Sequence, residues 1–157
     1  MAEITLRTEL SELASLAAFI ERFAAAEGLP AEVAFQLNLV LEELVTNSVS
    51  HGKAGAGGGT IRLRLERTGD VVEADLVDQG VAFDPNTIAP PDLDAPLAER
   101  PLGGLGVFLV RQFVDELDYR REAGCNHLRL RKRLVPARGG KDSHRGWVSN
   151  DRQIRPG

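Results

Sequence analysis

The chain has 157 residues, a net charge of −4, and is 43% hydrophobic and 27% charged, which is the size of one globular domain with a core of its own. Its single cysteine, Cys125, excludes an internal disulfide framework and a zinc site built from cysteines. We expect a cytoplasmic protein with no membrane partner, because no apolar run approaches the roughly 20 residues that span a bilayer and residues 1–10 do not form a basic-then-apolar leader.

The charge is unevenly distributed along the chain. Residues 1–119 carry 8 Lys/Arg against 20 Asp/Glu, a net charge of −12, whereas residues 120–157 carry 11 against 3, a net charge of +8. The basic part could meet an acidic partner, or it could be a solvated strand face followed by a tail. An aromatic content of 5% argues against stacked-base recognition, so we expect no direct nucleic-acid partner.

The first half of the chain predicts one strand and two helices. A strand is expected over residues 3–7, and apolar residues recur at helical spacing over residues 9–27. Gly28 is a natural helix stop, and Pro30 suits the first turn of a second helix that runs to about Ser50. That helix is apolar nearly all round and is expected to be the buried helix of the domain. Its apolar residues are Val33, Phe35, Leu37, Leu39, Val40, Leu41, Leu44, Val45 and Val49.

The second half predicts two hairpins that flank a loop and a helix. The expected elements are a glycine-rich loop at 52–59, strands at 60–67 and 71–78, a helix at 105–115, and strands at 117–121 and 126–134. Residues 85–101 hold five of the eight prolines and indicate a functional or disordered loop. This order predicts an α/β (α+β) two-layer sandwich, with a mixed, largely antiparallel sheet covered on one face by about three helices.

The domain is expected to span residues 1–135. Residues 136–157 are polar and basic with scattered glycine and proline, so they are expected to form a flexible tail without a packed core of its own.

The first candidate site feature is the pair Glu43 and Asn47 on the second helix. Residues four apart lie on one helical face and can meet the same ligand atom, whereas Glu42 points about 100° away. A carboxylate on a largely buried helix is costly unless it is paired, hydrogen-bonded or near a metal. The alternative is that both residues are buried polar groups that serve only helix ends and loops.

The second feature is the stretch from Asp78 to Asp84. Asp78 continues the inward face of its strand, so its carboxylate should point to the core side at the sheet end. Gly80 permits the backbone to leave sharply. A buried carboxylate there needs a donor, for which the exocyclic amine of a purine is suitable. The alternative is an ordinary turn that ends a strand.

The third feature is the run Gly103-Gly104-Leu105-Gly106, which opens a helix. Glycines let the backbone approach a polyphosphate closely, and the first N–H groups of the helix point toward it with the positive end of the helix dipole. The alternative is a flexible hinge before a helix.

Together these three stretches resemble the GHKL (Bergerat-fold) ATP-binding superfamily, and within it the stand-alone anti-sigma-factor serine/threonine kinases. Residues 38–52 look like the N box, residues 77–85 like the G1 box and residues 103–110 like the G2 box. The similarity spans about residues 1–135.

The resemblance implies roles for individual residues. Asn47 would ligate Mg2+, an ion that prefers hard oxygen ligands, and Glu43 would act as general base toward a serine hydroxyl or water. Asp78 would bind the adenine amine, and residues 85–102 would form an ATP lid. Arg100 is a candidate contact for the γ-phosphate, although it stands further from the G2 glycines than expected.

Two positions depart from the pattern of the superfamily. Ala82 replaces the second glycine of the G1 box, and Asn126 stands where a threonine of the last strand is common, so its amide would supply the hydrogen bond to water or adenine. The residues expected to contact ATP are Asn47, Asp78, Gly80, Ala82, Gly103, Gly104, Leu105, Gly106 and Asn126.

The resemblance implies an ATP- and Mg2+-dependent kinase that sequesters a sigma factor, phosphorylates a serine or threonine of a STAS-type anti-anti-sigma protein, and forms a homodimer. The alternative is a non-catalytic module that binds a regulator under nucleotide control, in which Glu43 and Arg100 need not act. A catalytic domain of histidine-kinase type is disfavoured, because the sequence shows no helix pair with a phosphoacceptor histidine.

Overall fold

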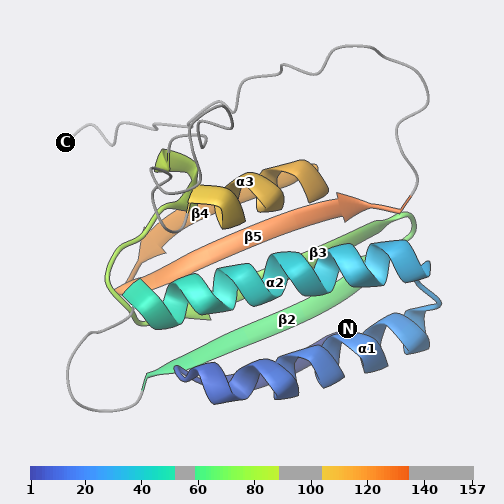
Figure 1. Ribbon diagram of the computed structural model, residues 1–157, viewed down its shortest axis with the longest axis horizontal. Coiled ribbons are helices and arrows are strands. Elements are labelled where there is room, and N and C mark those ends of the chain that lie inside the picture. Colours follow the sequence, from blue (N-terminus) through green and yellow to red (C-terminus); the bar gives the residue numbers. More distant parts are fainter. Residues whose placement is uncertain (52–58, 89–103, 135–157) are drawn as a thin grey trace, which may run out of the picture.

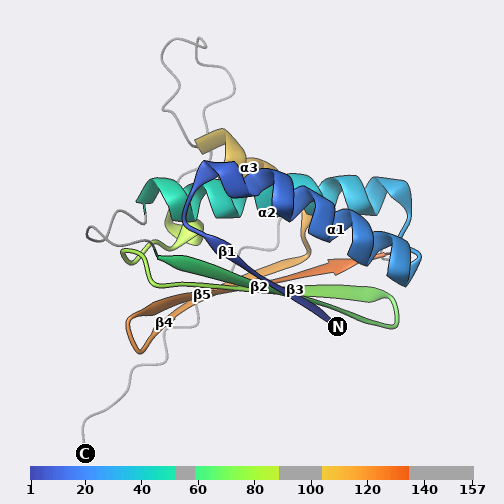
Figure 2. The ribbon, with the colours of Figure 1, turned by 90° about the horizontal axis from the view of Figure 1, so that it is seen from below.

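A computed structural model describes residues 1–51, 59–88 and 104–134 of the chain. Within these residues the fold has two layers, a five-stranded sheet and three α-helices that cover one face of it (Figure 1, Figure 2). The elements are β1 (Ala2–Arg7), the 3-10 helix η1 (Leu10–Glu12), α1 (Leu13–Glu27), α2 (Ala31–His51), β2 (Thr60–Thr68), β3 (Val71–Asp78), the 3-10 helix η2 (Pro85–Thr87), α3 (Gly104–Phe113), β4 (Glu116–Glu122) and β5 (Cys125–Arg133).

The strand order in the sheet is β1-β2-β3-β5-β4. Each of the four pairings between described strands is antiparallel. The two-layer sandwich expected from the sequence is therefore confirmed, and within the described residues its sheet is wholly antiparallel where a mixed sheet was expected. The crossover that makes this order places β5 between β3 and β4, so the last strand lies beside the strand that ends at Asp78.

The junction between α1 and α2 follows from two residues with special backbones. Gly28 adopts φ 60°, and Leu29 N donates to Ala24 O at 2.9 Å, which satisfies a free carbonyl at the helix end. Pro30 lies one residue before α2, and its carbonyl accepts the first helical hydrogen bond from Ala34 N at 3.0 Å. Pro30 thus caps the helix, although the sequence predicted it inside the first turn.

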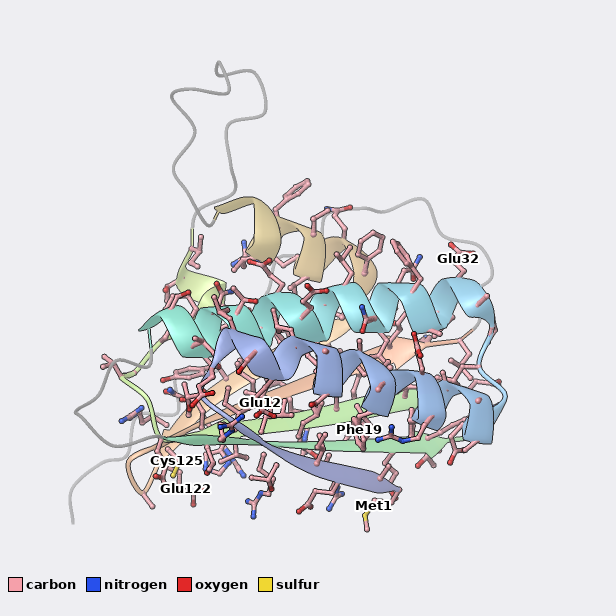
Figure 3. All side chains as sticks on the ribbon, turned by 60° about the horizontal axis from the view of Figure 1, so that its bottom comes forward. Met1, Glu12, Phe19, Glu32, Glu122 and Cys125 are labelled. Carbon is pink, nitrogen blue, oxygen red and sulfur yellow. The ribbon has the colours of Figure 1, made fainter. Side chains whose placement is uncertain are left out.

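Helix α2 lies in the middle of the helical layer, with α1 and α3 on either side (Figure 1), and it supplies the centre of the core. The prediction of a buried helix is confirmed for most of its apolar residues. Phe35 differs, because 66% of its surface is exposed. Side chains fill the layer between helices and sheet (Figure 3). The largest fully buried ones are Leu6, Leu16, Ile20, Leu37, Leu41, Leu44, Ile61, Leu63, Leu65, Leu76, Leu117 and Leu130.

Helix α3 ends at Phe113, two residues before the predicted end. The reason is that Asp115 already belongs to the sheet: its N–H donates to Arg131 O at 2.9 Å and its Oδ2 accepts from Arg133 N at 2.6 Å. These bonds to β5 compete with the helical pattern and anchor the C-terminal end of α3 to the sheet.

Strands β4 and β5 are joined by a tight two-residue turn. Ala123 and Gly124 both have positive φ, 50° and 80°, which is typical of the type I′ turn that matches the twist of a hairpin. Glu122 and Cys125 consequently pair across the start of the hairpin and lie side by side there (Figure 3).

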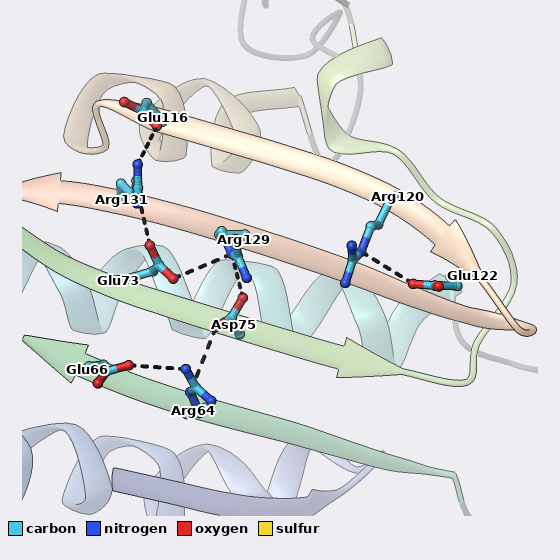
Figure 4. A network of polar contacts seen from close by, with 9 residues as sticks. All are labelled: Arg64, Glu66, Glu73, Asp75, Glu116, Arg120, Glu122, Arg129 and Arg131. Carbon is cyan, nitrogen blue, oxygen red and sulfur yellow. Dashed lines mark hydrogen bonds and ion pairs between the residues drawn. The ribbon is translucent and has the colours of Figure 1, made fainter. Parts of the chain in front are cut away.

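The face of the sheet away from the helices carries a network of charged side chains (Figure 4). Arg129 pairs with Asp75 at 2.9 Å, Arg131 pairs with Glu73 at 2.7 Å, and Arg120 pairs with Glu122 at 3.7 Å. Exposed pairs of this kind contribute about 0–1 kcal/mol each. The network therefore indicates a hydrated sheet face more than a source of stability.

The expected tail at 136–157 lies outside the described residues. No described helix is long and apolar enough to cross a membrane.

Candidate functional site

Asn47 on α2 and Asp78 at the end of β3 line the same cavity. Its volume is about 10 Å3, which is room for about one water molecule. Two of the three stretches singled out in the sequence therefore meet at one place, and β5 joins them. The lining residues are Leu44, Asn47, Ser48, Asp78, Val81, Phe83, Asn126 and Leu128.

Asp78 is buried, with 5% of its surface exposed, and it lies on the helix side of the sheet as the alternation of β3 predicts. Its Oδ1 accepts from Gly80 N at 2.7 Å and from Asn126 Nδ2 at 2.9 Å. Its Oδ2 accepts from Ser48 Oγ at 3.0 Å. The protein therefore supplies three donors to this carboxyl group, and its two oxygens still have acceptor capacity for another donor such as an amine.

Asn126 is 3% exposed and orients Asp78. Its Nδ2 donates to Asp78 Oδ1 and to Val81 O, both at 2.9 Å. Its Oδ1 accepts from Tyr119 Oη at 2.9 Å and from Arg121 Nη1 at 2.8 Å. These four bonds use the whole hydrogen-bonding capacity of the amide, so in this structure Asn126 serves the protein. A direct contact of Asn126 with nucleotide stays a prediction.

Ser48, Tyr119 and Arg121 were missed by the sequence analysis. Ser48 carried a signal, because it is a polar residue four positions after Leu44 and so on the core side of α2. A hydroxyl group therefore stands where the helical pattern would place an apolar side chain, and it lies next to the carboxylate of Asp78 at the end of β3. Tyr119 and Arg121 gave no such signal. Their common partner is Asn126, and this contact depends on which strands are neighbours in the sheet.

Glu43 lies in direct contact with Gly106 at the start of α3. A Cβ built on residue 106 would come within 2.6 Å of Glu43 Cγ and closer still to Cδ and Oε1. The glycine at this position thus lets α3 approach the Glu43 carboxyl group, and it brings the G2 stretch beside the N-box stretch.

The environment of Glu43 raises the pKa of its carboxyl group above the ordinary value of 4.5. Burial is the main cause, and the neighbouring negative charge of Glu42 adds to it. Both effects disfavour the charged form. A carboxylate whose pKa is raised toward neutrality is a better proton acceptor, as a general base requires.

Asn47 has a buried side-chain nitrogen, Nδ2, without a hydrogen-bond partner. A half-turn of the amide would place its oxygen at the same point, so a terminal atom of Asn47 is available to a ligand in the cavity. Among the described residues no group of three or more His, Cys, Asp or Glu could hold a metal ion alone. This donor set fits Mg2+, which uses one or two protein ligands together with phosphates and water.

The remaining predicted site residues lie around the cavity, at the start of α3 or outside the described residues. Gly80 is half-buried and its carbonyl accepts from Arg121 Nη1 at 2.8 Å, whereas Ala82 is exposed beside the cavity wall. Gly104 and Leu105 form the first turn of α3. The predicted roles of Arg100 and Gly103, and all of the predicted lid at 85–102 beyond Ile88, fall outside the described residues.

Comparison with known proteins identifies the family. The profile of the histidine kinase-like ATPase domain matches residues 6–132. The chain is 33% identical over 140 residues to the serine/threonine-protein kinase BtrW of Bordetella bronchiseptica. This alignment covers 87% of this chain and 99% of BtrW. The chain is also 30% identical over 103 residues to the serine-protein kinase RsbW of Listeria monocytogenes. This alignment covers 63% of this chain and 66% of RsbW.

Solved structures agree on the fold. The RsbU and RsbW domains of a Mycobacterium tuberculosis protein match with a TM-score of 0.58 at 20% identity, over 88% of this chain and 34% of that chain. The blue-light activated histidine kinase of Erythrobacter litoralis matches with a TM-score of 0.51 at 20% identity, over 76% of this chain and 42% of that chain. With the profile match over residues 6–132, these findings show that the chain belongs to the histidine kinase-like ATPase (GHKL) domain family, whose fold binds ATP.

Proposed function

We propose that this protein is an ATP-dependent serine/threonine kinase of the anti-sigma type. It would sequester a sigma factor and phosphorylate a serine or threonine of a STAS-type anti-anti-sigma protein. The similarity to the serine/threonine-protein kinase BtrW and the serine-protein kinase RsbW supports the kinase activity and this choice of substrate residue. Such partners place the reaction in the cytoplasm, and the resemblance to the anti-sigma kinases also implies a homodimer.

The observation that carries the proposal is the convergence of Asn47 and Asp78 on one cavity, with Glu43 one helical turn from Asn47 and against α3. A buried carboxylate with spare acceptor capacity can pair with the amine of adenine. The buried amide of Asn47 lines the same cavity as that carboxylate and stands one helical turn after Glu43, where it would hold Mg2+. When bound, this ion would neutralise charge on the phosphates.

Glu43 would accept the proton of the partner's hydroxyl group. The hydroxyl oxygen then forms a bond to the γ-phosphorus, the bond between the γ-phosphorus and the bridging oxygen breaks, and ADP leaves. The contact with Gly106 fixes the carboxyl group beside the first turn of α3, whose N–H groups favour negative charge. Arg100 is the proposed cation for the γ-phosphate, and Gly103, Gly104 and Leu105 are the proposed backbone contacts.

Entry of a base needs movement of the cavity wall, because about 10 Å3 holds no more than a water molecule. Val81 and Phe83 line the cavity together with Asp78, and Val81 is 54% exposed. Displacement of these side chains, with Gly80 and Ala82 adjoining them, would admit the purine to the Asp78 carboxylate.

The test is to incubate the protein with γ-labelled ATP, Mg2+ and purified candidate anti-anti-sigma proteins. We expect a labelled serine or threonine on one of them. Glu43→Gln should bind ATP but lose transfer by at least about 100-fold, the scale of a general base. Its matched control is Glu42→Gln on the next residue, which should transfer phosphate at neutral pH like wild type.

Retained transfer in Glu43→Gln at the wild-type rate would remove Glu43 from the role of base. Complex formation that depends on ATP, without any phosphoprotein, would instead support a non-catalytic module gated by nucleotide. Failure to bind ATP by calorimetry would contradict the proposal as a whole.

A further inference from the structure

Residues 80–86, called the wall segment here, carry two side chains that line the cavity with Asp78, yet the segment has little regular structure. The segment runs from the end of β3 to η2 (Pro85–Thr87), and Val81 and Phe83 line the cavity from it. A segment without a strand ladder has backbone groups that need partners elsewhere. Its position is therefore set by contacts from other elements.

Arg121 of β4 holds the first end of this segment. Its Nη1 donates to Gly80 O at 2.8 Å and to Asn126 Oδ1 at 2.8 Å. Asn126 in turn donates to Val81 O and to Asp78 Oδ1, both at 2.9 Å. One guanidinium group therefore fixes both the start of the wall and the amide that orients the Asp78 carboxylate.

Arg111 of α3 holds the other end. Its Nη2 donates to Pro85 O at 3.2 Å and to Asn86 O at 2.7 Å. Its Nε is buried without a partner, which costs free energy, so the contacts with these two carbonyls must compensate for it. Because α3 also carries Gly106, the far end of the wall is tied to the helix that packs on Glu43.

We propose that Arg121 and Arg111 are positioning residues that hold the two ends of residues 80–86 and so set the fit of the cavity around a purine base. The inference rests on the proposed function and deepens it. The ends stay fixed while Val81 and Phe83 move to admit the base. Both arginines act through the wall and not by contact with the nucleotide.

The experiment compares Arg121→Met and Arg111→Met with a matched control, Arg120→Met. Arg120 is the neighbour of Arg121 but lies on the open sheet face, where it pairs with Glu122 (Figure 4). Calorimetry would measure the affinity of each protein for ATP, GTP and inorganic tripolyphosphate, all with Mg2+. Tripolyphosphate serves as a probe that lacks the base.

We expect each test variant to bind ATP about tenfold more weakly, because each loses two charge-assisted hydrogen bonds that position the segment but no direct contact with the nucleotide. Binding of tripolyphosphate should stay within about twofold of wild type, and the preference for ATP over GTP should decrease, because the defect is confined to the base end. Arg121→Lys, which keeps a charged donor, should recover part of the ATP affinity. The control should match wild type with every probe.

A parallel loss of ATP and tripolyphosphate affinity would indicate a general structural defect and overturn the inference. Unchanged ATP affinity in both variants would overturn it as well. These results are distinct from failure of the proposed function, in which the wild-type protein itself would not bind ATP.

Discussion

Glu43 and Gly106 are in such close contact that the carboxyl group of Glu43 occupies the space into which a side chain at residue 106 would project. These residues are 63 positions apart in the sequence, and they join the middle of the helical layer to the start of α3. The glycine is therefore required by a neighbouring side chain, whatever backbone freedom it also provides.

Gly106→Ala should force Glu43 or the start of α3 to move. Overpacking at such a contact costs about 1–3 kcal/mol, and displacement of the carboxyl group should lower phosphotransfer by more than about tenfold, as expected for a misplaced general base. Urea unfolding and the labelled-ATP assay would measure the two effects. The double variant Gly106→Ala/Glu43→Ala should regain stability but not transfer, and a double variant as unstable as Gly106→Ala would contradict this origin of the strain.

The raised pKa of Glu43 should set the acid limit of the reaction. A general base must be deprotonated, so kcat/KM is expected to fall as pH decreases through the folded-state pKa, which lies above 4.5. Glu42→Gln removes the like charge that contributes to the shift, and it should move this limb to lower pH. A pH–rate profile of both proteins tests this, and superimposable acid limbs would exclude a coupling between the two carboxyl groups.

The same shift has a consequence for stability. Between the unfolded-state pKa near 4.5 and the raised folded-state pKa, the native protein binds more protons at Glu43 than the unfolded chain does. The free energy of unfolding therefore decreases as pH rises through this window. Glu43→Gln should remove this dependence, which urea unfolding at several pH values would detect as a flatter profile than that of wild type.

Asn47→Ala should separate ligand binding from the stability of the free protein. The Nδ2 atom is buried without a partner, so its removal deletes an unsatisfied donor and should change the free energy of unfolding by no more than about 1 kcal/mol. The stabilisation by Mg2+ and ATP should disappear in thermal-shift measurements if Asn47 holds the ion. A variant that is stabilised by Mg2+ and ATP as much as wild type would remove Asn47 from the site.

The sequence predicted the elements of this fold because each carries its own periodicity or turn residue. The alternation of β3 placed Asp78 on the inner face, and Gly28 predicted the end of α1. Phe35 shows the limit of such reasoning, since an apolar residue on a buried helix can still lie on its one exposed side. Which side that is depends on how α1 and α3 pack, and periodicity does not contain this information.

Contacts within the site were predictable only in part. Glu43 and Asn47 follow from helical spacing, whereas the bonds from Arg121 to Gly80 and from Arg111 to Asn86 join residues 41 and 25 positions apart. These bonds depend on the insertion of β5 between β3 and β4 and on the docking of α3. The alternation of β4 places Arg121 on the same side as Leu117 and Tyr119, but the local sequence of neither arginine indicates which carbonyl groups it binds.

Ser48→Ala should remove one of the three hydrogen bonds that position the Asp78 carboxyl group and so lower the free energy of unfolding. Ser48 Oγ donates to Asp78 Oδ2 at 3.0 Å in a buried setting, and loss of this bond should destabilise the protein by about 1–3 kcal/mol, because a hydrogen bond to a charged acceptor is lost. Asp78 keeps its donors from Gly80 and Asn126, so its carboxyl group should keep its position. Urea unfolding measures the loss. Thr46→Ala, on the same helix but outside the cavity lining, is the control and should lose less.

Lys132 provides a test of the sheet end that anchors α3. Lys132 is buried, with 8% of the residue exposed, and its Nζ donates to Phe113 O at 2.6 Å. Burial lowers the pKa of Lys132 below 10.5, although Asp115 and Glu32 partly oppose the shift. Between the lowered folded-state pKa and 10.5 the unfolded chain binds more protons at this residue, so its contribution makes the protein more stable as pH rises.

Lys132→Met should abolish the pH-dependent contribution of Lys132 to stability, because the methionine side chain keeps an apolar stem at this position but has no group that titrates. The difference in free energy of unfolding between wild type and Lys132→Met is expected to shift in favour of wild type as pH rises toward 10.5. Urea unfolding of both proteins at a series of alkaline pH values measures this difference, and groups common to both proteins cancel from it. A difference that is constant with pH would mean that Lys132 titrates like an exposed lysine and that its burial does not perturb it.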